Sequence, residues 1–275
     1  MSKKSALRPR YLKLHAILVY AFLFAPIIVL VVFSFNQAKS STDWTGFSTH
    51  WYSELMHKEA ALQAFRNTLK VAFAATFFAT IIGTLGAFAL TRFRFRGRSG
   101  YSTLIFISLV MPEIVMAVSL TAFFRRFAHI ELSINTVIAA HITFCIAFVV
   151  VVVKARLTAF DNRLVEAAAD LGATPVQAFL RVVLPLATPG IAAGAMLAFV
   201  ISLDDVVITS FTAGPGSTTL PLYIFSQLRF GVSPSINALS SIVLLTALAL
   251  LTLGGLYSVR ASRRGAGGID ATTLG

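Results

Sequence analysis

The sequence has little of what soluble enzymes and secreted domains depend on. It holds one cysteine, Cys145, which excludes an intrachain disulfide framework. Its five histidines are scattered, and no Ser/His/Asp grouping or metal-ligand spacing occurs. The phosphate-binding pattern G-x-x-x-x-G-K-[ST] is also missing, because neither Gly83–Gly86 nor Gly214–Gly216 is followed by a Lys-Ser/Thr pair. We therefore expect no enzyme activity, and no metal ion or cofactor bound by this chain.

Charge is also scarce, since only 12% of the residues are charged while 57% are hydrophobic. With a mean hydropathy of +0.81, the chain is too apolar for a soluble domain. Several apolar runs are long enough to span a bilayer. We expect an all-α membrane protein with six transmembrane helices, at Leu14–Phe35, Asn67–Leu90, Tyr101–Phe124, Ile134–Val153, Leu186–Phe211 and Ile236–Val259. The first run is too long for a signal peptide and is expected to be an uncleaved span.

Short features between and within these apolar runs predict further details of the fold. The third run is expected to be interrupted at Pro112-Glu113, and Trp51–Phe65 to form a short helix on the outer surface. Ala75, Ala79, Gly83 and Ala87 recur every four residues in the second run. Such a face is smooth enough for close packing against another helix. Gly214–Pro221 reads as a turn in an external loop.

Basic residues outnumber acidic ones by 23 to 11, and their distribution indicates topology rather than nucleic-acid binding. Most of them lie in the segments that are inside if both termini are cytoplasmic. The predicted organisation is a cytoplasmic N-terminal segment, residues 1–13, a six-helix membrane domain, residues 14–259, and a flexible cytoplasmic tail, residues 260–275. Lys154–Pro185 is then also cytoplasmic.

The segment Glu166–Pro185, EAAADLGATPVQAFLRVVLP, is the most distinctive break between apolar runs. A first short helix is expected to end at Gly172, which tolerates a left-handed turn. Thr174 can cap a second short helix that has Pro175 in its first turn, and Pro185 is expected to end that helix. Two short helices joined at a glycine outside the membrane suit docking into a partner's groove.

The spacing in this segment resembles the EAA loop of bacterial ABC importer permeases. E-A-A is followed by three residues, a glycine, nine residues, an aliphatic residue, any residue and Leu-Pro. The aliphatic residue here is Val182, where the family usually has Ile. The resemblance implies coupling to an ATPase subunit through Glu166, Ala167, Ala168, Asp170, Gly172, Leu184 and Pro185.

The resemblance covers nearly the whole chain. Tyr20–Asn36, Met111–Glu113, Ser202–Ile208 and Gly231–Ala238 are similar to the polyamine branch of these permeases, and Gly214–Pro221 resembles its putrescine members more than its spermidine ones. The resemblance implies the type I importer permease fold and a location in the bacterial inner membrane. It also implies a small cationic substrate, putrescine or another polyamine. Relatives also move other amines or iron. The implied partners are a second homologous permease, a periplasmic substrate-binding protein and an ATPase dimer that holds ATP and Mg.

Acidic residues inside the spans are candidates for the substrate pathway. An ionised carboxylate at mid-membrane costs about 2.5–3.5 kcal/mol on insertion scales, so it needs a partner or a water-filled path. Asp205 falls on a small or polar stripe that we interpret as a cavity lining, together with Gly194, Ala198, Ser202, Thr209 and Thr212. The alternative for Asp205 is an internal ion pair with Lys70 or His141. Asp204 and Glu113 can be pathway or structural residues, and His141 is expected to be buried and hydrogen-bonded.

Two other classes of protein are alternatives. A secondary transporter driven by an ion gradient would fit a helix broken at Pro112 and buried acids, but it would not need the EAA segment. A membrane-embedded enzyme would need a nucleophile–base pair or a metal site, and the sequence offers neither.

Overall fold

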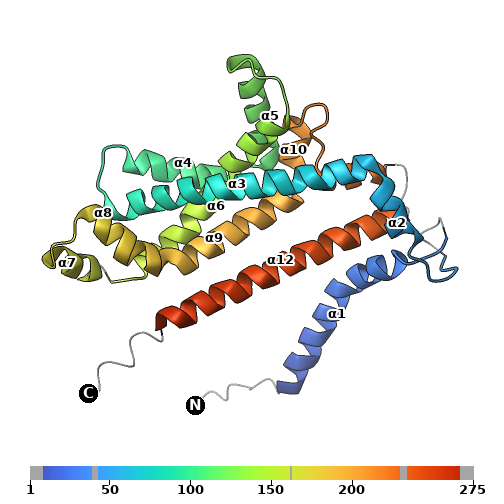
Figure 1. Ribbon diagram of the computed structural model, residues 1–275, viewed down its shortest axis with the longest axis horizontal. Coiled ribbons are helices and arrows are strands. Elements are labelled where there is room, and N and C mark those ends of the chain that lie inside the picture. Colours follow the sequence, from blue (N-terminus) through green and yellow to red (C-terminus); the bar gives the residue numbers. More distant parts are fainter. Residues whose placement is uncertain (1–8, 39–42, 162, 230–233, 267–275) are drawn as a thin grey trace, which may run out of the picture. The chain divides into compact units, whose positions relative to one another are not determined.

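The structure is a computed structural model, and it describes residues 9–38, 43–161, 163–229 and 234–266 (Figure 1). These residues are almost entirely helical. The helices are α1 Pro9–Phe33, α2 His50–His57, α3 Glu59–Arg92, α4 Arg98–Val110, α5 Glu113–Ala122, α6 Ile134–Thr158, α7 Arg163–Asp170, α8 Pro175–Ala178, α9 Leu184–Asp204, α10 Val207–Thr212, α11 Leu220–Leu228 and α12 Pro234–Ala266, with two π-helical turns, η1 Phe123–Phe127 and η2 Phe179–Val183.

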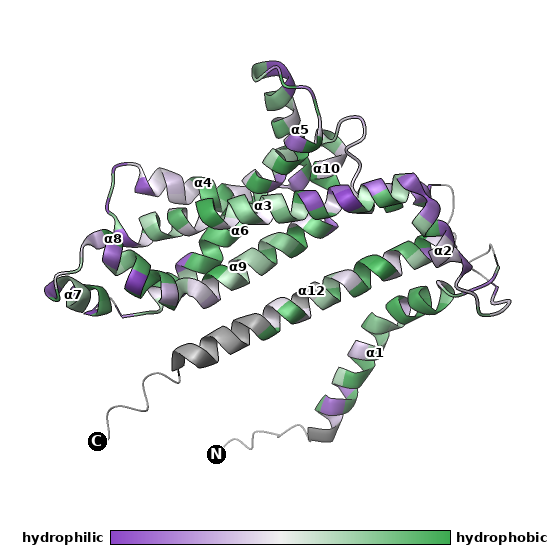
Figure 2. Ribbon diagram, in the orientation of Figure 1, coloured by the Kyte–Doolittle hydropathy of each residue, from purple (hydrophilic) through white to green (hydrophobic). Residues whose placement is uncertain are grey.

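Within the described residues, five helices are long and apolar enough to cross a membrane, and a sixth span results if α4 and α5 are taken together. Hydrophobic residues predominate in α9 and in α1, apart from polar residues near the start of α1 (Figure 2). The predicted all-α membrane fold is confirmed. The chain divides into two compact units, residues 1–59 with 226–246 and residues 60–225 with 247–275.

Some helix boundaries differ from those expected. The surface helix predicted at Trp51–Phe65 is in fact α2 followed by the first two turns of α3, since α3 begins at Glu59. No Gly or Pro interrupts the sequence between Glu59 and Asn67, so the helix continues into the second span. The predicted flexible tail is helical as far as Ala266, where α12 ends. The rest of the tail, the first eight residues and residues 231–233 of Gly231–Ala238 lie outside the described residues.

The third span is broken where the sequence predicts it. α4 and α5 meet at an angle of 113° across Met111 and Pro112. Met111 is extended, with ψ 133°, as expected for a residue before proline, whose ring excludes the helical conformation. Glu113 then lies in the first turn of α5.

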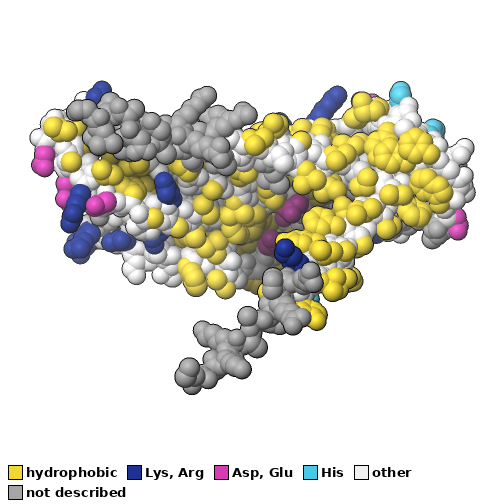
Figure 3. Space-filling model, turned by 90° about the horizontal axis from the view of Figure 1, so that it is seen from below, with side chains coloured by type: hydrophobic (Ala, Val, Ile, Leu, Met, Phe, Trp, Pro, Cys, Tyr) yellow, Lys and Arg dark blue, Asp and Glu magenta, His cyan; other side chains and the backbone are white. Residues whose placement is uncertain are grey.

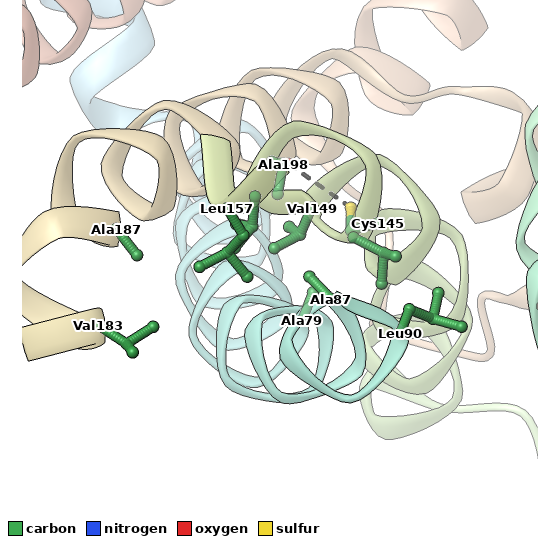
Figure 4. Close-up of a cluster of buried hydrophobic side chains, with 11 residues drawn as sticks. Ala79, Ala87, Leu90, Cys145, Val149, Leu157, Val183, Ala187 and Ala198 are labelled. Carbon is green, nitrogen blue, oxygen red and sulfur yellow. Dashed lines mark hydrogen bonds between the residues drawn. The ribbon is translucent and has the colours of Figure 1, made fainter. Parts of the chain in front are cut away.

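The larger unit is built around α6, which packs against α9, α4 and α10. Its main hydrophobic cluster combines Ala79, Ala87 and Leu90 of α3 with buried side chains of α6 and α9 (Figure 4). α3 comes so close to α6 at Gly83 that a Cβ there would lie 2.7 Å from the Val149 Cβ. The predicted smooth face of α3 is therefore a helix-packing face, since all four of its residues are buried.

The smaller unit holds a loop organised by one buried amide. Asn36 is fully buried; its side chain donates to the Asp43 carbonyl over 2.7 Å and accepts from the Thr45 N–H over 3.0 Å. The indole of Trp51 donates to the Asn36 carbonyl over 2.7 Å. These bonds hold Asn36 against Asp43, Thr45 and Trp51.

Candidate functional site

The segment between α6 and α9 has the predicted helix–turn–helix form. α7 ends at Asp170, and Gly172 has φ +81°, the left-handed conformation in which a Cβ is strained. Thr174 and Gln177 form a reciprocal capping box: the Gln177 N–H donates to the Thr174 hydroxyl over 3.3 Å, and the Thr174 N–H to the Gln177 side chain over 3.0 Å. Pro175 lies in the first turn of α8.

The prediction that Pro185 ends the second helix is wrong. α8, η2 and α9 form one continuous helix of 30 residues, Pro175–Asp204. The missing N–H of Pro185 leaves a carbonyl one turn earlier without its helical donor. The π-helical turn η2 lies directly before it, and such local widening is how membrane helices accommodate proline. Pro185 is thus near the start of α9 rather than at the end of α8.

This helix–turn–helix lies at the end of the unit away from the α5–α10 contact (Figure 1). It carries exposed apolar side chains. Leu171 is 89% exposed, Val176 67% and Leu180 52%. Glu166 and Asp170 are exposed as well. Hydrophobic residues rimmed by charges are typical of a protein-interaction surface.

The interpretation of the α9 stripe as a cavity lining is wrong. Gly194, Ala198, Ser202, Thr209 and Thr212 are all buried. A Cβ at Gly194 would lie 3.5 Å from Val149, and the Cys145 thiol lies 3.5 Å from the Ala198 carbonyl, so this part of the stripe packs against α6. Small residues permit close helix packing as readily as they line a cavity, and the sequence pattern does not separate the two.

Asp205 is buried, and its carboxylate is engaged within the chain. It accepts hydrogen bonds from the Ile208 N–H over 3.1 Å, the Thr209 N–H over 2.8 Å and the Thr209 hydroxyl over 2.9 Å. Nε2 of His141 lies 3.3 Å from the carboxylate. This is the internal pairing that the alternative interpretation predicted, with His141 rather than Lys70 as the partner.

His141 joins this network from α6 and, as expected, is buried and hydrogen-bonded. Its Nδ1 lies 2.8 Å from the Ser202 hydroxyl, and its Nε2 lies 3.1 Å from the Thr209 hydroxyl. Ser202 precedes the break in the helix and Thr209 follows it. One imidazole therefore bridges α9 and α10.

The break itself was not predicted, because the sequence there contains neither Pro nor Gly. α9 ends at Asp204, Asp205 is extended with ψ 132°, and α10 begins at Val207. The Asp205 carboxylate accepts N–H groups in the first turn of α10, which is how Asp stabilises a helix N-terminus. An aspartate directly before the apolar residues Val206, Val207 and Ile208 is the signal that could have revealed the break.

Asp204, the neighbouring carboxylate, is exposed on the membrane domain, and so is Glu113. Glu113 lies in the first turn of α5, and Asp204 is the last residue of α9. The contact between α5 and α10 brings these two broken spans together. Figure 3 shows acidic side chains within a hydrophobic stretch of one face. The structure thus separates the two aspartates: the Asp205 carboxylate is buried and hydrogen-bonded within the chain, whereas Asp204 is exposed.

Solved structures with the same arrangement of helices identify the fold. The chain superposes with a TM-score of 0.74 on a subunit of a bacterial ABC transporter involved in the import of the acidic polysaccharide alginate, at 18% identity, covering 91% of this chain and 94% of that one. A chain of the MetNI methionine ABC transporter matches with a TM-score of 0.66 at 18% identity, covering 76% and 98%. The fold is that of ABC importer permeases.

Sequence comparison identifies the family. Residues 79–264 match the model of the binding-protein-dependent transport system inner membrane component. The chain is 45% identical to the spermidine/putrescine transport system permease protein PotC of Shigella flexneri over 91% of its length and 94% of that protein's. It is 45% identical to the putrescine transport system permease protein PotI of Escherichia coli strain K12, covering 83% of each. The chain belongs to this family of inner-membrane transport components.

Proposed function

We propose that this chain is the permease subunit of an ATP-driven importer and forms the translocation path for a polyamine such as putrescine or spermidine. The observation that carries the proposal is the pair of exposed carboxylates, Glu113 and Asp204, within apolar spans. The substrates named for PotC and PotI support it.

A diamine suits this pair of carboxylates. Removing an ammonium group from water is costly unless an opposite charge replaces its hydration. Two carboxylates within apolar spans are costly in the same way, and each needs a cation or a water-filled path. An anionic substrate would instead need arginines or helix N-termini at this point. Asp205, Ser202 and Thr209 support the path by holding the helix break, and they do not contact the substrate in this proposal.

The proposed partners are those implied by the resemblance to ABC importer permeases, and each is assigned here to a surface that the single chain leaves exposed. A second permease would cover the exposed carboxylates from the other side, and a periplasmic binding protein would deliver the substrate. The helix–turn–helix of α7 and α8, with Glu166, Ala167, Ala168, Asp170 and Gly172, would seat in the ATPase dimer, where ATP and Mg are bound. Leu184 and Pro185 would join it to the fifth span.

Substrate-stimulated ATP hydrolysis by the reconstituted complex tests the function. With a loaded binding protein present, putrescine or spermidine should raise the hydrolysis rate several-fold, while sugars and oxyanions should not. Stimulation by an oxyanion, or transport without any co-purifying ATPase, would contradict the proposal.

Gly172→Val should abolish transport while the permease still inserts into the membrane. The β-branched side chain is strained at φ +81° by on the order of 1 kcal/mol or more, so the α7–α8 turn changes conformation. Nothing lies within 4 Å of a Cβ at this position, so the effect is due to the backbone and not to a clash. Gly172→Asn is the matched control, because Asn adopts this conformation readily. Equal transport by both variants would show that the turn is not needed for coupling.

The orientation is tested by labelling Ala169→Cys, an exposed position on α7. The basic residues around this segment support the proposal that it is cytoplasmic. A membrane-impermeant maleimide added to intact cells should therefore leave the cysteine unlabelled, and should label it once the cells are opened. The native Cys145 is buried and provides a low background. Labelling in intact cells would reverse the proposed topology.

A further inference from the structure

A narrow groove of about 130 Å³ lies between α4 and α6. One wall is a single face of α4, formed by Ser102, Ile105, Phe106 and Leu109 at spacings of three and four residues. Val150 of α6 lies opposite. An apolar cavity of about 150 Å³ accepts a molecule the size of benzene, so this groove has room for a short length of hydrocarbon chain.

α4 is packed more loosely than the other spans of this unit. None of its described side chains is buried, although it is 13 residues long and contacts α6. Leu104 is 63% exposed and Phe106 66%. The groove therefore opens toward the surroundings of the unit rather than into its core.

The polar end of the groove is positively charged. Lys154 of α6 lines it, and Arg98 lies on α4 one turn before Ser102, on the same face of the helix. Neither side chain forms an ion pair with any described residue. The N-terminus of α4 adds to this charge, since its N-cap is Gly97 and no side chain caps it.

More basic residues lie at the same end of the unit. Arg94 and Arg96 are exposed in the link between α3 and α4. Figure 3 shows Lys and Arg side chains gathered at the end where α7 and α8 lie. A groove that is apolar along its length and cationic at the membrane boundary matches the two parts of a phospholipid.

We propose that this groove binds an anionic phospholipid, with one acyl chain between α4 and α6 and the phosphate at Lys154 and Arg98. A juxtamembrane basic residue contributes about 1 kcal/mol toward anionic lipid, which is about fivefold in binding for each residue. A zwitterionic lipid with the same chains would fill the groove without this gain, because its own cation offsets its phosphate. The lipid would hold α4 against α6, beside the helix–turn–helix of α7 and α8.

Photo-cross-linking of the assembled transporter complex tests this binding. Phosphatidylglycerol and phosphatidylcholine with the same diazirine-bearing acyl chain are incorporated in separate preparations, and adducts are mapped by mass spectrometry. Phosphatidylglycerol adducts should appear on residues 102–109 at least fivefold more often than phosphatidylcholine adducts. Lys154→Gln should lower the phosphatidylglycerol yield about fivefold. Lys13→Gln, an equal charge change at an exposed position on α1, should leave it unchanged.

The remaining outcomes are also decisive. Equal yields from the two lipids in the unaltered complex would show that α4 merely faces the bilayer. No adduct with either lipid in an assembled complex would show that another subunit covers the groove. If Lys154→Gln fails to assemble, Arg98→Gln, at an exposed position, provides the same comparison and should give the same fivefold loss.

Discussion

Replacing Asp204 by Asn should abolish polyamine uptake while the complex still assembles. The side chain is exposed beside the break between α9 and α10, so the substitution removes charge without leaving a buried group unpaired. Truncating one partner of a desolvated charge pair costs about 2–5 kcal/mol, equivalent to a loss of about 30-fold or more in affinity. Radiolabelled putrescine uptake into cells that produce equal amounts of the complex measures this effect.

Two further variants test the role of the two exposed carboxylates, Glu113 and Asp204. Glu113→Gln removes the second carboxylate and should impair uptake in the same direction. Glu131→Gln removes an exposed carboxylate in the link between η1 and α6, outside the spans, and should leave uptake unchanged. Normal uptake by the Asp204→Asn variant would contradict the assignment of this carboxylate to the pathway.

Replacing His141 by Ala should lower the stability of the protein, and it should not alter the surface because His141 is buried. The substitution removes the imidazole next to the buried Asp205 carboxylate and leaves the Ser202 hydroxyl without that partner. Breaking a buried pair costs about 3–5 kcal/mol. A loss of this size lowers the melting temperature of a chain of this size by roughly 10 °C.

The melting temperature of the purified complex, followed by intrinsic fluorescence, measures this loss. His15→Ala is the matched control, because His15 is exposed on α1 and no hydrogen bond of its side chain has been identified. Its melting temperature should match that of the unaltered protein. An unchanged melting temperature for His141→Ala would show that the network around Asp205 does not hold the α9–α10 break.

The features predicted correctly from the sequence depend on local chemistry. Pro112 breaks the third span because it lacks an N–H. The chain turns at Gly172 because a residue without a Cβ adopts a positive φ without strain. The cap formed by Thr174 and the placing of Pro175 in the first turn of α8 follow from the same kind of rule. Each depends on a few neighbouring residues, so the sequence alone is sufficient.

The features that were missed depend on what lies opposite a residue in space. The small stripe on α9 is compatible with a cavity or with a neighbouring helix, and only the position of α6 decides between them. Asp204 and Asp205 are adjacent in sequence, and the helix was expected to continue through both. The break that buries the Asp205 carboxylate and leaves Asp204 exposed was therefore not foreseen. Proline ends many helices, but the π-helical turn before Pro185 allows this helix to continue past the proline.

The unbroken helix from Pro175 to Asp204 has a mechanical consequence. Its 30 residues measure about 45 Å, with the proposed ATPase contact at one end and the Asp204 carboxylate at the other. A rod of that length pivoting by about 10° at its middle moves its two ends by roughly 4 Å in opposite directions. A tilt imposed on α8 would therefore displace the Asp204 carboxylate. In the proposed function, the helix would act as a lever arm between the ATPase contact and the substrate path.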